Sequence, residues 1–268
     1  MGGFARRMSY WNAFARKYPD RPALRIDGGS IFATGVAEAP LLNRWMLEGT
    51  FLSRLDAVHL SLDDLPVWRE LADLAAAGHV PKAHLAIPLV SANVTARVPN
   101  FPKIEPYIVK TIALPGKRSL RVGITSALFD LEERVRAEEF IVRPPAEALR
   151  EVLASLQKQS DYRVVLTDMD LGRAMSTVVT IPGINVMLVS HNYVALMDAQ
   201  QIGETVVILP VNEGRMISEV RLGIDAGASR LKLETRFVPL DASVPDEPTL
   251  GELVRKARLE LDAFLGQR

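Results

Sequence analysis

Residues 184–196, INVMLVSHNYVAL, begin as a largely apolar run and then break into polar residues that include Ser190, His191 and Tyr193. A short apolar run of this kind predicts a buried strand, and ligands of α/β proteins bind beyond the carboxyl ends of such strands. The stretch therefore predicts an α/β domain with a polar site at the end of this strand. His191 is either a metal ligand at that site or an ordinary polar residue that caps the strand.

The composition is that of a globular protein and excludes several classes of function. The chain has 268 residues, of which 48% are hydrophobic and 24% charged. Basic and acidic residues both number 32, so nothing in the net charge indicates nucleic-acid binding. The absence of cysteine excludes disulfides, thiolate metal sites and a cysteine nucleophile. No run approaches the ~20 apolar residues of a membrane helix, and the first residues lack the apolar core of a signal peptide.

Helical and strand patterns alternate along the chain, which predicts a layered, mixed α/β fold. Apolar residues recur at helical spacing in 4–18, 40–55, 66–77, 145–159 and the last 20 residues, where Thr249 begins the helix. Strands are expected at 23–26, 56–60, 84–93, 106–114, 119–128, 162–170, 204–211, 219–225 and 229–240. We expect one domain over 1–268, with a core of about 2–240 and a closing helix at about 249–266.

Four of the predicted strands end in polar groups, at 27–30, 59–64, 167–170 and 190–193. Carboxylates and imidazoles from separate strands are what a divalent metal site needs, because no single segment can surround an ion. Taken singly, however, an aspartate at such a place is more often a turn residue or a helix cap. Capping of the following helix is the simpler role for Asp63 and Asp64, and His59, His79 and His84 are expected to be structural. Arg6 and Arg7 are expected to face either an anion or solvent.

The order of these segments resembles the calcineurin-like metallophosphoesterases, in their 5′-nucleotidase and cyclic-phosphodiesterase branch. The resemblance covers about residues 2–222 and rests on partial matches in the family's order: GGFARRMSYWNAFARKYPDRPALRIDGGSIF, LDAVHLSLDDL, PLVSANV, RVGITSAL, DYRVVLTDMD and PGINVMLVSHNY. It implies a two-layer β-sandwich flanked by helices. It also implies two cations at the strand ends, about 3.5–4 Å apart, that activate a water and hold a phosphate.

The family's ligand positions are mostly substituted in this chain. The aspartate that bridges the two metals falls on Ser30, the asparagine of the next motif on Leu62, and the catalytic histidine on Asp63. The later ligand histidine falls on Asp168, while the last motif keeps its first histidine as His191 and has Tyr193 in place of its second. A neutral serine hydroxyl does not hold two dications together as a carboxylate does.

We therefore expect no metal cofactor or, at most, a single Mn, Zn or Mg ion on His191 and Asp168, with Asp63 as the catalytic candidate. The alternative to metal binding for Asp168 is a role in a turn. The same two roles, metal ligand or turn residue, are open for Asp170. For His191, the alternatives to metal binding are a residual histidine whose ring forms a hydrogen bond with a neighbouring strand end, or an unrelated role. As a protein, the chain is expected to be a binding or structural module with a degraded site; the alternative is a phosphoester hydrolase with a reduced site around Asp168 and His191.

The family's opening strand, which supplies an Asp-x-His pair, has no counterpart, because Met1 stands directly before Gly2 and Gly3. Either the natural chain begins upstream, or the gap is closed by rearrangement, or a strand from another copy or a partner fills it. The compartment follows the same alternatives: cytoplasmic as the sequence stands, exported if a leader has been removed. The branch's second, substrate-binding domain is also missing, so nucleotide specificity is not expected.

Overall fold

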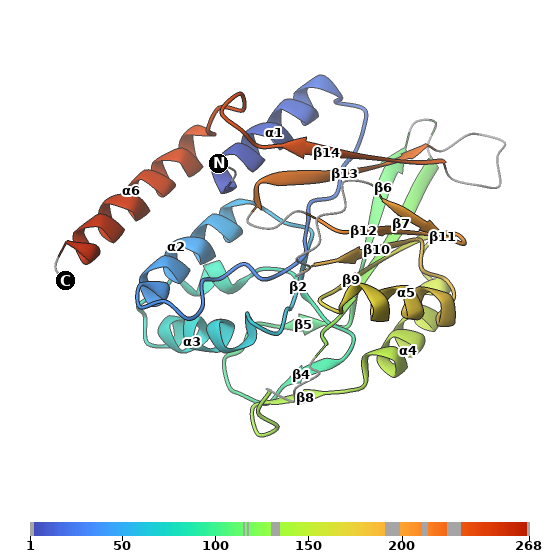
Figure 1. Ribbon diagram of the computed structural model, residues 1–268, viewed down its shortest axis with the longest axis horizontal. Coiled ribbons are helices and arrows are strands. Elements are labelled where there is room, and N and C mark those ends of the chain that lie inside the picture. Colours follow the sequence, from blue (N-terminus) through green and yellow to red (C-terminus); the bar gives the residue numbers. More distant parts are fainter. Residues whose placement is uncertain are drawn as a thin grey trace.

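A computed structural model describes residues 3–114, 116, 118–129, 135–190, 199–210, 214–223 and 232–266. Two sheets form its centre and helices flank them (Figure 1). The helices are α1 (Phe4–Lys17), α2 (Ala39–Leu52), α3 (Leu65–Ala76), α4 (Pro145–Gln157), α5 (Leu171–Thr180) and α6 (Pro248–Leu265), with a 3-10 helix at Lys82–Leu85. No described helix has both the length and the apolar character needed to cross a membrane.

The first sheet, here called the short sheet, has four parallel strands in the order β1-β2-β3-β5. They are β1 (Ile26–Asp27), β2 (Ala57–His59), β3 (Leu89–Val90) and β5 (Ile104–Glu105). Because all four are parallel, their carboxyl ends lie at one edge of the sheet. The predicted polar strand ends at 27–30 and 59–64 are thereby brought to the same side of the molecule.

The second sheet, here called the long sheet, has six strands in the order β11-β12-β10-β9-β7-β6. Its four central strands are mutually parallel, and β6 and β11 are antiparallel edges. The bounds are β6 (Tyr107–Leu114), β7 (Arg118–Ala127), β9 (Tyr162–Thr167), β10 (Val186–Val189), β11 (Gln200–Ile202) and β12 (Thr205–Ile208). Outside both sheets lie two antiparallel pairs, β4 (Val94–Ala96) with β8 (Phe140–Val142) and β13 (Met216–Gly223) with β14 (Lys232–Pro239).

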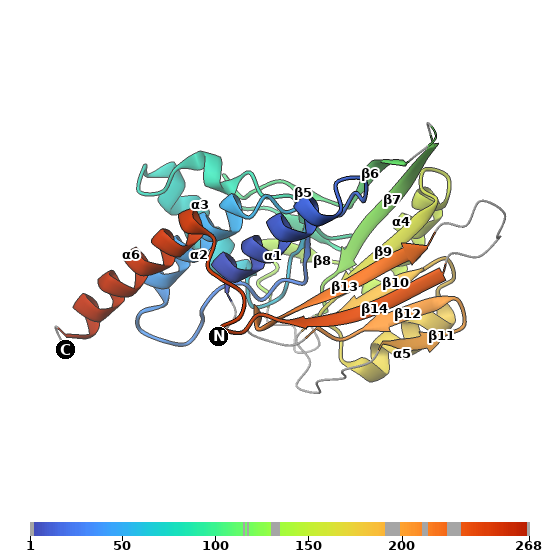
Figure 2. The same cartoon turned by 90° about the horizontal axis from the view of Figure 1, so that it is seen from above.

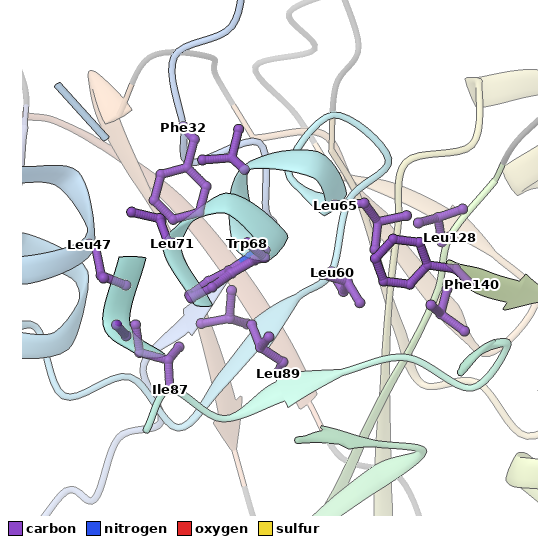
Figure 3. Close-up of a cluster of buried hydrophobic side chains, with 14 of the residues drawn as sticks. Phe32, Leu47, Leu60, Leu65, Trp68, Leu71, Ile87, Leu89, Leu128 and Phe140 are labelled. Carbon is purple, nitrogen blue, oxygen red and sulfur yellow. The ribbon is translucent and has the colours of Figure 1, made fainter. Parts of the chain in front are cut away.

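Alternate faces of the two sheets carry three apolar layers. Between the sheets, Ala57 and Val90 of the short sheet pack with Ile124 and Leu166 of the long one. The other face of the short sheet packs on α2 and α3 around Trp68 (Figure 3). The rings of Trp68 and Phe32 lie edge to face, with their centroids 5.0 Å apart. The outer face of the long sheet is covered by α4 and α5. The expected two-layer β core flanked by helices is confirmed.

Helices α1 and α6 lie together at one side of this sandwich, with the β13–β14 hairpin beside α1 (Figure 2). Ala5 and Met8 of α1 pack on Leu250 and Leu253 of α6. Tyr10 ties α1 to the hairpin by donating a hydrogen bond of 2.9 Å to Glu219. The closing helix therefore packs on its own domain along its first turns.

Some predicted elements differ from the structure, among them the strand expected at 23–26, of which only Ile26 pairs. Residues 84–93 do not form one strand: the 3-10 helix ends at Leu85, and only Leu89 and Val90 pair in the sheet. Pro88 has no N–H to donate, which shortens the pairing at that point. The closing helix begins at Pro248 rather than at Thr249, and its cap is Glu247, whose carboxylate accepts the Leu250 N–H at 2.8 Å.

Candidate functional site

The turn after β1 brings three strand ends together. Gly29 has a φ of +80°, and a Cβ there would lie 2.7 Å from the carbonyl oxygen of His59 at the end of β2. A Cβ on Gly28 would lie 3.0 Å from that of Ser190, which follows β10. Only glycines permit both approaches. The turn therefore lies against the ends of β2 and β10, as the polar strand ends predicted.

Asp27 holds this turn to α1. Its carboxylate accepts one hydrogen bond from the Gly29 N–H at 3.1 Å and another from the Arg7 guanidinium at 2.7 Å. The side chains of Arg7 and Asp27 are only 18% and 13% exposed. Arg7 therefore pairs with a carboxylate of its own chain and is mostly buried, which corrects the solvent-facing role expected for it.

The residue after this turn joins a network centred on Asp64. The Ser30 N–H donates to the Ser61 hydroxyl oxygen at 2.8 Å, and that hydroxyl donates to Asp64 Oδ2 at 2.8 Å. The N–H groups of Ile31 and Phe32 donate to the two oxygens of Asp64, each at 3.1 Å. Asp64 occupies the cap position of α3, but its side chain makes no capping bond. The expected capping role is therefore wrong for Asp64, which joins two turns instead.

Burial dominates the protonation of Asp64. The residue is 0% exposed, and this burial raises the pKa of its carboxyl to about 6, although the hydrogen bonds from Phe32, Ile31 and Ser61 oppose the change. Removing a carboxylate from water disfavours its charged form.

Asp168 joins the ends of three strands across the two sheets. Its Oδ2 accepts the Leu62 N–H at 3.0 Å, and its Oδ1 accepts the Phe129 N–H at 2.7 Å. Burial raises the pKa of this carboxyl, but the neighbouring His59 imidazole and these two N–H groups outweigh burial and hold the pKa below its ordinary value. The side chain is thus both buried and stabilised in its charged form.

These interactions leave the buried imidazole of His59 without a hydrogen-bond partner, as they do the Nε of Arg7. His59 lies two residues after Ala57 on β2, so its side chain also points between the two sheets. The ring is 0% exposed, and its Nε2 lies 3.7 Å from Asp168 Oδ1, beyond hydrogen-bond distance. Neither ring nitrogen has a hydrogen-bond partner. A buried polar group without a partner indicates a water, an ion or strain.

The ends of β9 and β10 carry a hydroxyl donor, Ser190, and a helix cap, Asp170. The Ser190 hydroxyl donates to the Thr167 carbonyl oxygen at 3.1 Å, which ties the end of β10 to that of β9. Asp170 caps α5 by accepting the Arg173 N–H at 3.0 Å, whereas a metal ligand or a turn role is expected for it from the sequence. Asp63 is half-buried. His191 and Tyr193 lie outside the described residues.

Known proteins share this architecture. No family model matches the sequence. A 5′-nucleotidase precursor from Thermus thermophilus superposes with a TM-score of 0.76 over 98% of this chain, at 18% identity. The sulfate thiohydrolase SoxB of Thermus thermophilus superposes with a TM-score of 0.75 over 96% of this chain, at 15% identity. The fold is that of the calcineurin-like metallophosphoesterases.

A curated relative agrees with this fold. YunD of Bacillus subtilis (strain 168), described as an uncharacterized metallophosphoesterase, is 20% identical over 205 residues, which are 76% of this chain. The chain spans 41% of YunD, 54% of the 5′-nucleotidase and 46% of SoxB. It therefore spans about half the length of the proteins that it matches.

Within this metallophosphoesterase fold, the described strand ends offer few metal ligands. Among these residues there is no group of three or more His, Asp or Glu side chains placed to hold an ion. The carboxylates of Asp27, Asp64 and Asp168 each accept hydrogen bonds on both oxygens. The donor set of a dinuclear centre is therefore not assembled by the described part of the chain.

Sequence reasoning gave no role to Ser61, and it gave Arg7 and His59 roles other than the contacts they make here. Ser61 joins the Ser30 turn to Asp64, Arg7 pairs with Asp27, and His59 faces Asp168. Alternation along residues 56–60 was the available signal for His59, because it places the histidine on the same face as Ala57. No local pattern predicts the Ser30–Ser61 and Arg7–Asp27 contacts, because each of them joins two separate segments.

Proposed function

We propose that this chain is a 5′-nucleotidase-like metallophosphoesterase-fold module with a degraded dinuclear metal site, which serves binding or structure rather than catalysis. The observation that carries the proposal is the engagement of Asp64 and Asp168. Both oxygens of each carboxylate accept main-chain N–H groups. N–H donors at these oxygens compete with a cation for the same lone pairs.

The substituted positions support the same proposal. The resemblance places the bridging carboxylate at Ser30, whose N–H is bonded to Ser61. A neutral hydroxyl there does not offset the repulsion between two dications. It also places an amide ligand at Leu62, an aliphatic residue whose N–H is bonded to Asp168. In this proposal, hydrogen bonds tie the turns together where the family uses metal ions.

One observation favours the alternative, a metal-dependent phosphoester hydrolase with a reduced site around Asp168 and His191. His59 has two buried nitrogens without partners, and its Nε2 lies 3.7 Å from Asp168. An imidazole nitrogen and a carboxylate oxygen are suitable ligands for one divalent ion of the zinc type. In this alternative His59 completes the reduced site.

A metal and turnover measurement separates the two functions. The purified chain is dialysed against Mn²⁺ or Zn²⁺, its bound metal is counted, and hydrolysis of an aryl phosphate ester is followed. The proposal expects no bound metal and no turnover above buffer. Turnover that disappears in both Asp168→Ala and His191→Ala, but persists in the surface controls Asp20→Ala and His79→Ala, would establish the hydrolase instead.

A further inference from the structure

The long sheet ends in an open edge strand. β6 forms one border of the sheet, and all eight of its residues pair with β7, from Tyr107 opposite Thr125 to Leu114 opposite Arg118. No other described strand pairs with β6, which Figure 2 shows at the outside of the molecule. An edge of this length presents a row of unpaired backbone groups, which proteins protect or use for pairing. By contrast, the opposite edge, β11, has three residues.

The usual protections against edge pairing are weak on β6. Its sequence is YIVKTIAL, which contains no proline and a single charge. That charge, Lys110, is neutralised by Asp56 at 3.0 Å. Residues with high strand propensity and little net charge favour addition of another strand. Because the lysine has a counter-ion, it is a weak barrier to an apolar or neutral strand, although a second lysine directly opposite it remains unfavourable.

A hollow of about 530 Å³ lies at the start of the strand. Its walls are the apolar residues Ala86, Ile87, Pro88 and Ile108, together with Tyr107 and the charged residues Lys103 and Glu105. Such a hollow accepts an aliphatic side chain from a strand added at this edge. The edge therefore combines main-chain pairing with a place for a side chain, which are the two components of recognition by strand addition.

The strand is complementary to itself in one central register. Two copies related by a twofold axis pair antiparallel, with the same residue of both copies meeting at the axis. An even-numbered residue of one copy therefore stands opposite an even-numbered residue of the other, and an odd-numbered residue opposite an odd-numbered one. An axis at Lys110 places two lysines opposite each other, which is unfavourable. An axis at Thr111 places the two threonines together and sets Lys110 opposite Ile112 of the second copy. The same register sets Ile108 opposite Leu114, whose side chain then lies beside the hollow.

We propose that β6 pairs antiparallel with β6 of a second copy of this chain, with Thr111 on the twofold axis, so that the two long sheets become one continuous sheet. The pairing is isologous, because each copy offers the same edge to the other. It uses an edge away from the strand-end carboxylates. It is therefore independent of whether the proposed function is correct.

A single cysteine tests the register directly, because the chain contains none of its own. Residues directly opposite in an antiparallel pair have Cα atoms about 4.5–5.5 Å apart, within the range that a disulfide bridges. Thr111→Cys is expected to form a covalent dimer as its main species under mild oxidation. The matched control is Thr95→Cys, since Thr95 is also an exposed threonine on a strand. Equal cross-linking of the two variants would overturn the register.

Sedimentation equilibrium tests the dimer without a cross-link. The natural chain is expected to be a dimer at micromolar concentration. Thr111→Arg is expected to weaken association about tenfold or more, because it places like charges across the axis. Thr95→Arg is expected to leave association unchanged, and circular dichroism checks that both variants fold. A natural chain that sediments as a monomer at about 100 µM overturns the proposal, and so does a dimer that Thr111→Arg leaves intact.

Discussion

Asp64 and Asp168 occupy comparable places, each just beyond a parallel strand and each bound to two main-chain N–H groups. Their pKa values nevertheless move in opposite directions, upward for Asp64 and downward for Asp168. The difference lies in the third neighbour. Asp64 has a neutral hydroxyl from Ser61, and the nearby charge of Asp27 raises its pKa further. By contrast, the imidazole of His59 lowers the pKa of Asp168.

This comparison shows that a strand end in this fold can be completed in two ways. Around Asp64, protein donors satisfy both carboxylate oxygens, so the carboxyl joins two turns. Around Asp168, the carboxyl is satisfied but its neighbour His59 is not. The first arrangement is complete without a ligand, and the second leaves two imidazole nitrogens without a hydrogen-bond partner. Substitutions in the two places are therefore expected to have different costs.

The largest effect is expected from Asp64→Ala. It leaves the Ile31 and Phe32 N–H groups and the Ser61 hydroxyl without their acceptor. Buried donors that lose a partner cost about 1–3 kcal/mol each, so we expect the free energy of unfolding to fall by roughly 3–5 kcal/mol. The matched control is Asp63→Ala, next to it and half-buried, with an expected loss below about 1 kcal/mol. Urea titrations measure both, and equal losses would remove the distinction between these neighbours.

The next effect is a dependence on pH that Asp64 confers. Its pKa is raised from 3.8 to about 6 in the folded chain, so the folded state holds a proton more tightly than the unfolded state does. Stability from this group is therefore greatest at low pH and is lost as pH rises from about 4 to about 6. About two pKa units correspond to about 3 kcal/mol. The stability difference between the natural chain and Asp64→Asn should narrow by up to that amount between pH 4 and pH 7, in urea titrations at each pH. A difference that is constant or that widens contradicts the raised pKa.

The sequence predicts the fold further than it predicts the site. Apolar periodicity locates β9 and β10, because strands buried on both faces are nearly continuous apolar runs. The order of the partial motifs also identifies the two-layer core. The partners within the site are less predictable, because the Ser61–Asp64 network and the Arg7–Asp27 pair depend on which turns meet in space. Asp64 illustrates this: its position before a helix indicates a cap, yet its side chain turns toward Ile31 and Phe32.

The smallest effect on stability is expected from substitution of His59, which lies beside Asp168 and has no hydrogen-bond partner. His59→Leu replaces a buried ring that makes no hydrogen bond with an apolar side chain, and such a change costs little where no bond is lost. We expect the free energy of unfolding to change by less than about 1 kcal/mol.

The pKa of Asp168 should rise at the same time, because its neighbouring imidazole is gone. A ¹³C NMR titration of the aspartate carboxyls measures that rise. His79→Leu, at an exposed histidine, is the control for both measurements.

A loss of about 3 kcal/mol or more in the free energy of unfolding at His59 alone contradicts the prediction, because it means that the two nitrogens have a partner in solution. Metal analysis of the same sample then distinguishes a bound ion from a buried water. Such an ion would move the balance from the non-catalytic module to the reduced metal site.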